Sequence, residues 1–156
     1  MALRIWIDAD GCPNEIKQIV FKASDRLQVP AFLVANVPLA TPRWPLVESV
    51  VVSHQFNAAD DYIAETVAPG DVVVTADVPL AARVVEKGAV AIDPRGGIYD
   101  EHTVGERLAV RNLMQELRSG GYIQGGPAPI HAGDRGKFAA SLDKLLTRRL
   151  KEKKAE

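Results

Sequence analysis

Short, strongly apolar runs alternate with helix-like segments along this chain, and the alternation limits the folds open to it. The apolar runs fall at 3–7, 31–35, 47–52, 71–75 and 89–92, and helical periodicity falls at 13–28, 57–67, 79–87, 103–117 and 134–151. Strands that are apolar on both faces are typical of parallel sheets, because each crossover lays a helix over a face. We therefore predict an α/β fold of three layers, α/β/α, around a mainly parallel central sheet.

The chain has 156 residues, which is enough for one domain with a substantial core. We expect a single domain over 1–151 and a disordered basic tail over 152–156. Segments 37–46 and 119–133 are rich in Pro or Gly and predict irregular loops. Two helices carry apolar side chains at helical spacing, namely Val104, Leu108, Leu113 and Leu117 in one, and Phe138, Leu142, Leu145, Leu146 and Leu150 in the other.

Charge and cysteine content limit the partners and the cellular compartment that we expect for this chain. With 19 basic and 20 acidic residues the formal net charge is −1, so nucleic-acid binding would need a local patch. Cys12 is the one cysteine, which excludes an intramolecular disulfide and favours a reducing cytoplasm. No apolar run reaches the length of a membrane span and no secretory leader is evident. We expect a cytoplasmic protein with no membrane partner, and the sequence leaves homo-oligomerisation open.

Two carboxylates follow the first apolar run at a spacing of two. Ile5-Trp6-Ile7 leads into Asp8 and Asp10, and side chains at i and i+2 of a strand share a face. Two like charges held together are costly unless a cation lies between them, so the pair favours a divalent metal site. The alternative is that an Asp caps the following helix, which accounts for only one of the two.

Further acids follow other strands. Asp77 and Asp93 come after the runs at 71–75 and 89–92, and the carboxyl ends of parallel strands share one sheet edge where ligands bind. Asp60 and Asp61 open a helix that could lie along the same rim, although an acid in the first helical turn also suits the helix dipole. Asp93 alternatively shapes a turn before Pro94. An acidic edge of this kind suits Mg²⁺ and a metal-assisted attack on a phosphodiester.

Polar and cationic residues near that edge are candidates for phosphate contacts. Thr75 ends a strand beside the acids, although Thr is also a common strand former. The segment 129–137 is Gly-rich and leads into a helix N-terminus, a geometry that favours anions. Its alternative is an Asp134 cap with solvated Arg135 and Lys137. The remaining candidates are scattered along the chain: Asn36, Arg43, Arg83, Arg95, Arg111 and His131.

Several motifs together resemble one known family. They are IWIDADGCP at 5–13, NAADDYI at 57–63, VVTADVPLA at 73–81, DPRG at 93–96 and GDR at 133–135 with Phe138 beyond. This combination resembles the YaiI/YqxD family of uncharacterised bacterial proteins, which is similar to PIN-like domains. The resemblance implies a parallel sheet between helices. It also implies a nuclease that binds Mg²⁺ or Mn²⁺ through acids at strand ends and cuts RNA. The D-x-D-G-x-P start departs from the single leading Asp typical of PIN nucleases.

By position, Asp8 matches the first-strand acid of PIN nucleases, with Asp10 beside it. Asp60 or Asp61 matches their mid-chain acid, and Asp77 matches their later strand-end acid. The resulting hypothesis is a divalent-metal-dependent nuclease of RNA or DNA, with RNA favoured. Its catalytic residues are Asp8, Asp10 and Asp77, and its metal ligands are Asp8, Asp10, Asp61 and Asp77. Its substrate-binding residues are Asn36, Thr75, Asp60, Arg95, Arg135 and Lys137.

Two other functions stay open from the sequence. A haloacid-dehalogenase-like phosphatase uses a strand-one D-x-D with the first Asp as nucleophile, a role Asp8 could take with Asp10 as general acid. That motif normally has Thr or Val two residues after the second Asp, where this chain has Cys12. The other alternative is a non-catalytic module that binds RNA or protein.

Overall fold

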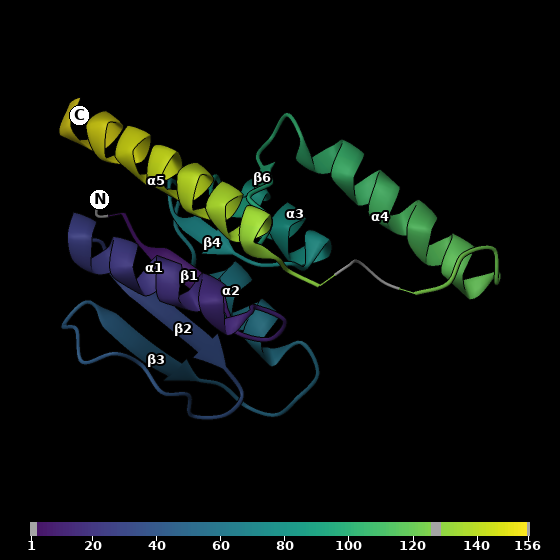
Figure 1. Cartoon of the computed structure of the whole chain (residues 1–156), viewed down its shortest axis with the longest axis horizontal. Coiled ribbons are helices and arrows are strands. Elements are labelled where there is room, and N and C mark those ends of the chain that lie inside the picture. The colour runs from purple at the N-terminus through teal and green to yellow at the C-terminus, as the bar shows by residue number, and fades with distance from the viewer. Residues whose placement is uncertain (1–2, 126–128, 156) are drawn as a thin grey trace.

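The computed structural model describes residues 3–125 and 129–155. Its centre is a six-stranded sheet in the order β3-β2-β1-β4-β5-β6 (Figure 1). The strands are β1 (Ile5–Asp8), β2 (Ala31–Ala35), β3 (Val47–Val51), β4 (Val72–Val74), β5 (Val90–Ile92) and β6 (Ile98–Tyr99). All neighbouring pairs are parallel except β5 and β6, which are antiparallel. The predicted mainly parallel sheet is confirmed.

Helices cover both faces of this sheet. They are α1 (Asn14–Leu27), α2 (Ala58–Thr66), α3 (Val78–Glu86), α4 (Val104–Ser119) and α5 (Ala132–Ala155). One core contains Ile5 and Ile7 of β1 with side chains of α1 and α5, and the other contains Trp6 with side chains of α2 and α3. Because successive strand residues point to opposite faces, the apolar strands supply both cores. The predicted three-layer α/β/α arrangement is thereby confirmed.

β1 and β4 lie side by side at the centre, although α1, β2, β3 and α2 separate them in sequence. From β1 the chain moves to β2 and β3 on one side, and it returns to build β4 and β5 on the other. The loops that leave the carboxyl ends of β1 and β4 therefore diverge, which opens a crevice at this point of the sheet. The acids that follow these two strands lie at this crevice.

The amino end of β4 is fixed by a buried carboxylate. Asp71 is fully buried, and its Oδ2 accepts hydrogen bonds from Trp6 Nε1 at 3.0 Å and from the backbone N–H of Ala68 at 3.0 Å. The Arg4 guanidinium lies 3.1 Å from the same oxygen. A buried charge needs such partners. Asp71 therefore holds the end of the sheet opposite to the crevice.

Two features differ from the boundaries expected from sequence. β6 follows a turn in which the Asp93 N–H donates to the Gly97 carbonyl at 2.9 Å, and Gly96 has a φ of 90° that favours glycine. Two residues are too few for a period-two pattern to reveal. α5 continues to Ala155 and covers positions 152–155, where a disordered tail was expected; good helix formers and an Arg149–Glu152 pair at 3.6 Å support it.

The positions 126–128 of the expected loop, and Glu156 of the expected tail, lie outside the described residues. Of the helices that the structure describes, none has the length and apolarity needed to cross a membrane.

Candidate active site

Asp8 is the last residue of β1, and it shares the α2/α3 face of the sheet with Trp6 because the two are two residues apart. Only 4% of Asp8 is exposed. The Thr75 hydroxyl donates to its Oδ2 at 2.9 Å, while Oδ1 has no hydrogen-bond partner. Burial raises the pKa of Asp8 to about 6 against the Thr75 hydrogen bond, with smaller contributions from the charges of Asp77 and Asp10.

Thr75 connects Asp8 to Asp77. It is fully buried, and its Oγ1 accepts the backbone N–H of Asp77 at 3.0 Å. Asp77 precedes α3, and its Oδ1 accepts the backbone N–H of Leu80 at 3.1 Å as an N-cap. The sequence suggested Thr75 as a substrate contact. The structure places it beneath the acids, where it orients them.

The adjacent acids Asp60 and Asp61 face different ways on α2. Asp61 Oδ1 lies 2.8 Å from Arg83 Nη1 in an exposed ion pair. The pKa of Asp60 is instead raised to about 7, by burial first, then by the charges of Asp8 and Asp77 and a hydrogen bond with Asp77, against Arg83. Asp60, which the sequence predicts as a substrate-binding residue, thus lies with Asp8 and Asp77. Asp61, which the sequence predicts as a metal ligand, lies against an arginine.

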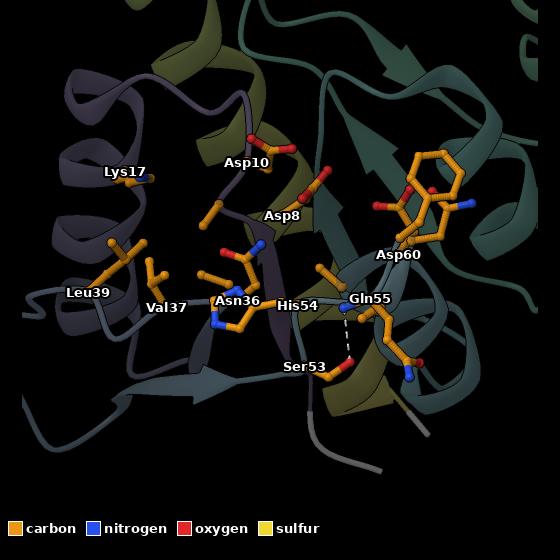
Figure 2. A pocket seen from close by; sticks show the side chains of 16 residues that line it. Asp8, Asp10, Lys17, Asn36, Val37, Leu39, Ser53, His54, Gln55 and Asp60 are labelled. Carbon is orange, nitrogen blue, oxygen red and sulfur yellow. Dashed lines mark hydrogen bonds between the residues drawn. The ribbon is translucent and has the colours of Figure 1, made fainter.

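Asp10 reaches the site through a turn. β1 ends at Asp8, and the chain then bends at Gly11, whose φ of 78° favours glycine. Asp10 is exposed beyond the strand, so it does not share a strand face with Asp8 as the spacing predicted. It nevertheless lies beside Asp8 at the same crevice, as Figure 2 shows.

Two adjoining cavities, of about 490 Å³ and about 480 Å³, open at this crevice and share Asp8, Asp10 and Asp60 in their walls. We call them the acidic cavities. Asn36, a predicted substrate contact, lines the larger one, opposite Lys17 on α1 (Figure 2). Asp77 and Arg111 line the smaller one.

Lys17, His54 and Phe56 also line the acidic cavities, and none of the three was singled out for this site from the sequence. Lys17 lies in the first turns of the helix that follows the Asp8 to Pro13 motif, and this position was the available signal. Phe56 lies in both walls and is 92% exposed. No periodicity marks a single aromatic residue in a loop, because exposure there depends on tertiary packing.

The other predicted substrate contacts lie away from the acidic cavities. Arg95 Nη1 is 2.8 Å from Asp134 Oδ2, and the two join the β5–β6 turn to the first turn of α5. Asp134 Oδ2 also accepts the backbone N–H of His131 at 3.2 Å, which caps this helix end. Arg135 and Lys137 are not among the described residues that line these cavities.

Asp93 and Cys12 both have surroundings that indicate a structural role. Asp93 Oδ1 accepts the backbone N–H groups of Arg95 and Gly97, each at 2.9 Å, and Oδ2 accepts the Tyr99 hydroxyl at 2.9 Å. Asp93 therefore shapes its turn, as the alternative interpretation held. Cys12 is buried, and burial raises its pKa to about 12, so it stays a protonated thiol at neutral pH.

Within residues 3–125 and 129–155, no three Asp, Glu, His or Cys side chains are close enough to form a metal site by themselves. The carboxylates at the crevice instead interact pairwise: Asp8 with Asp10, Asp8 with Asp77, and Asp60 with both Asp8 and Asp77. The arrangement thus concentrates negative charge around one buried carboxylate oxygen that lacks a partner.

Comparisons with known proteins give a consistent picture. A family model described as the uncharacterised YaiI/YqxD family matches residues 6–148. The chain is 61% identical over 150 residues to UPF0178 protein GSU0171 of Geobacter sulfurreducens, covering 96% of this chain and 99% of the relative. It is 58% identical over 154 residues to a UPF0178 protein of Trichlorobacter lovleyi, covering 99% and 100%. A UPF0178 protein of Hahella chejuensis is 47% identical over 94% of this chain and 97% of its own length. No solved structure matches the chain at a significant level.

Proposed function

This chain belongs to the YaiI/YqxD family, and we propose that it is a divalent-metal-dependent nuclease that hydrolyses phosphodiesters of RNA or DNA, with RNA favoured. The reaction takes place at the acidic cavities. The observation that carries the proposal is the buried Oδ1 of Asp8, which lacks a partner and lies among three further carboxylates, those of Asp10, Asp60 and Asp77.

The carboxylates of Asp71 and Asp8 differ in the charges that surround them. Asp71 also has a buried Oδ1 without a hydrogen-bond partner, but the Arg4 guanidinium neutralises this carboxylate at 3.1 Å. The groups that act on the pKa of Asp8 are instead a hydroxyl, a backbone N–H and two further carboxylates. Concentrated negative charge without a cationic partner is the environment that a bound cation stabilises.

The residues present fit Mg²⁺ or Mn²⁺. Mg²⁺ in proteins keeps several waters and is held by one or two carboxylates, with substrate phosphates completing its shell. Paired carboxylates therefore suit it without a closed cage of three. A pair of these carboxylates, Asp8 with Asp10 or Asp77, would hold the ion. Asp60 replaces Asp61 as a neighbour of this pair because Asp61 is paired with Arg83.

A bound divalent ion supplies Lewis-acid stabilisation of the phosphate and lowers the pKa of a water. The chain's own residues do the rest. Thr75 holds Asp8 so that Oδ1 is directed away from its hydrogen bond. Burial and the charges of Asp8 and Asp77 raise the pKa of Asp60 to about 7, so a cation that neutralised the cluster would lower this pKa and release the Asp60 proton. Lys17 lines the larger acidic cavity and Arg111 lines the smaller one. Both supply positive charge for phosphate oxygens.

The test is cleavage of end-labelled single-stranded RNA, single-stranded DNA and duplex RNA by the purified chain with Mn²⁺, Mg²⁺ or EDTA. We expect metal-dependent cleavage of RNA that Asp8→Asn and Asp77→Asn each abolish. Asp61→Asn, purified in parallel, is the matched control and should keep cleavage, because Asp61 faces Arg83. Circular dichroism checks that each variant is folded.

Other outcomes identify the rival functions. Turnover of p-nitrophenyl phosphate with a trapped acyl-phosphate at Asp8 would replace the nuclease by a phosphatase. RNA binding that survives Asp8→Asn together with Asp77→Asn, with no cleavage by the wild type, would replace it by a binding module. The absence of both cleavage and Mn²⁺ binding by calorimetry would refute the metal-dependent nuclease.

A further inference from the structure

A third cavity, of about 430 Å³, adjoins the smaller acidic cavity. Ala76, Val78 and Arg111 line both cavities. Its other walls come from the turn at Gly11, from the β5–β6 turn and from α4. A bound strand could therefore cross directly from the acids into this second hollow.

Three guanidinium groups line this third cavity, those of Arg95, Arg111 and Arg118; we call it the arginine cavity. Among the described residues that line it, Asp93 is the one acid, and backbone N–H groups of the turn and the Tyr99 hydroxyl already donate to its oxygens. Arg118 donates to the Gly125 carbonyl at 3.0 Å. Arg111 Nη1 donates an exposed 3.2 Å hydrogen bond to the side-chain oxygen of the neighbouring Asn112. An exposed bond of this kind is readily exchanged for a phosphate oxygen.

The same cavity has an apolar wall. Met114, Val78 and Ile130 line it together with Tyr99. Met114 is 37% exposed, and α4 has no buried residue along its length. α4 projects from the body of the molecule (green in Figure 1). Val104 at its start packs partly against the core, whereas Met114 is not among the side chains of either core. An accessible Met beside guanidinium groups matches a nucleotide, which presents an apolar base face next to a charged phosphate.

We propose that the arginine cavity binds one unpaired nucleotide of a single-stranded RNA, adjacent to the phosphate held at the acids. Met114 contacts the base, and Arg111, at the wall between the cavities, contacts the phosphate. The adjacency to a scissile phosphate rests on the nuclease proposed above. The substrate is single-stranded because a base must leave its duplex stack to enter a cavity, at a cost of about a few kcal/mol.

The test measures binding without cleavage. Fluorescence anisotropy in EDTA, with the full chain, compares a short labelled single-stranded RNA with single-stranded DNA, the RNA duplex and an abasic strand of the same length. Arg111→Ala should weaken single-strand binding about fivefold and reduce the slope of log Kd against log salt by about 0.7, as the loss of one phosphate contact requires. Met114→Ala should weaken binding to the base-bearing strand about fivefold and leave the abasic strand unaffected.

Two control variants change exposed residues that do not line the arginine cavity. Leu113→Ala changes the neighbouring residue of α4, which is 54% exposed and is not among the described lining residues. Arg148→Ala removes an exposed arginine of α5. Both should bind RNA as the wild type does.

The outcomes separate this inference from the nuclease. Single-strand binding that depends on Arg111 and Met114 without any metal-dependent cleavage would support the nucleotide site and refute the nuclease. The nucleotide site would be refuted if neither variant changed the KM for RNA cleavage, or if the duplex bound as tightly as the single strand. Either result would leave the nuclease proposal intact. Equal DNA and RNA affinity would overturn the restriction to RNA.

Discussion

The Thr75 hydroxyl donates a 2.9 Å hydrogen bond to Oδ2 of Asp8 between two neighbouring parallel strands. The other oxygen of that carboxylate, Oδ1, is buried and has no hydrogen-bond partner. The two residues are separated by 67 positions in sequence. Their contact exists because β1 and β4 pair at the centre of the sheet. The hydrogen bond fixes which oxygen of Asp8 is left for a ligand.

Thr75→Val should therefore destabilise the fold, because it keeps the shape of the side chain and removes the donor. Losing a buried hydrogen bond to a carboxylate costs about 2 kcal/mol, to be measured by urea denaturation at neutral pH. The pKa of Asp8 should rise further above about 6. Thr75→Ser, which keeps the hydroxyl, is the control, and equal stability of the Val variant and the wild type would contradict the assignment.

Asp60→Asn should stabilise the metal-free protein, and increasingly so as pH rises. The pKa of Asp60 in the folded state is about 7, against an ordinary value of 3.8 for an aspartate. Between those values the folded state binds more protons than the unfolded state, so this group lowers the free energy of unfolding as pH increases through the window. Asp60 is half-exposed, so we expect a gain of only about 0.5–1 kcal/mol above about pH 7.5 and almost none near about pH 4.

Asp61→Asn is the matched control for that experiment. It breaks an exposed ion pair with Arg83 at 2.8 Å, so it should cost at most about 1 kcal/mol. It should show no growing stabilisation over the same pH window. Urea denaturation at several pH values measures the free energy of unfolding of the wild type and of both variants. A stability difference between Asp60→Asn and the wild type that is independent of pH would contradict the raised pKa.

Mn²⁺ should raise the thermal midpoint of the wild type. A ligand at one hundred times its Kd adds about 2.7 kcal/mol of stability, which corresponds to about 5–10 °C for a chain of this size. Binding should also release protons, seen in calorimetry as heats that depend on the ionisation enthalpy of the buffer, because the carboxyls of Asp8 and Asp60 are partly protonated near neutral pH. Asp8→Asn should abolish both effects, and Asp61→Asn should keep them.

Arg95→Ala should destabilise the start of α5. It would leave the buried Asp134 carboxylate without the guanidinium that lies 2.8 Å away, at a cost of about 2–3 kcal/mol in urea denaturation. Arg95→Lys keeps the charge and should recover part of the loss. If Arg95→Ala instead left stability unchanged and weakened RNA binding alone, Arg95 would be a substrate contact, as the sequence first suggested.

The sequence by itself determined the architecture and the sheet edge at which the candidate site lies. Runs such as 31–35 and 72–74 are apolar on both faces, and this composition is typical of a sheet covered on both sides. The apolar face of Phe138, Leu142, Leu145 and Leu146 is buried as its helical spacing predicted. Acids placed after strands meet at one edge of a parallel sheet whatever the details of packing. The convergence of Asp8 and Asp77 followed from this rule.

Only the tertiary structure decided which acid takes which partner. Neighbouring residues on a helix point about 100° apart, so the rotation of α2 against the sheet directs Asp60 to the cluster and Asp61 to Arg83. The apolar positions of α4 had the spacing of a core helix, yet none of them is buried. Spacing records which side chains share a face of a helix. Whether another element covers that face depends on contacts between segments far apart in the chain, and no local pattern contains that information.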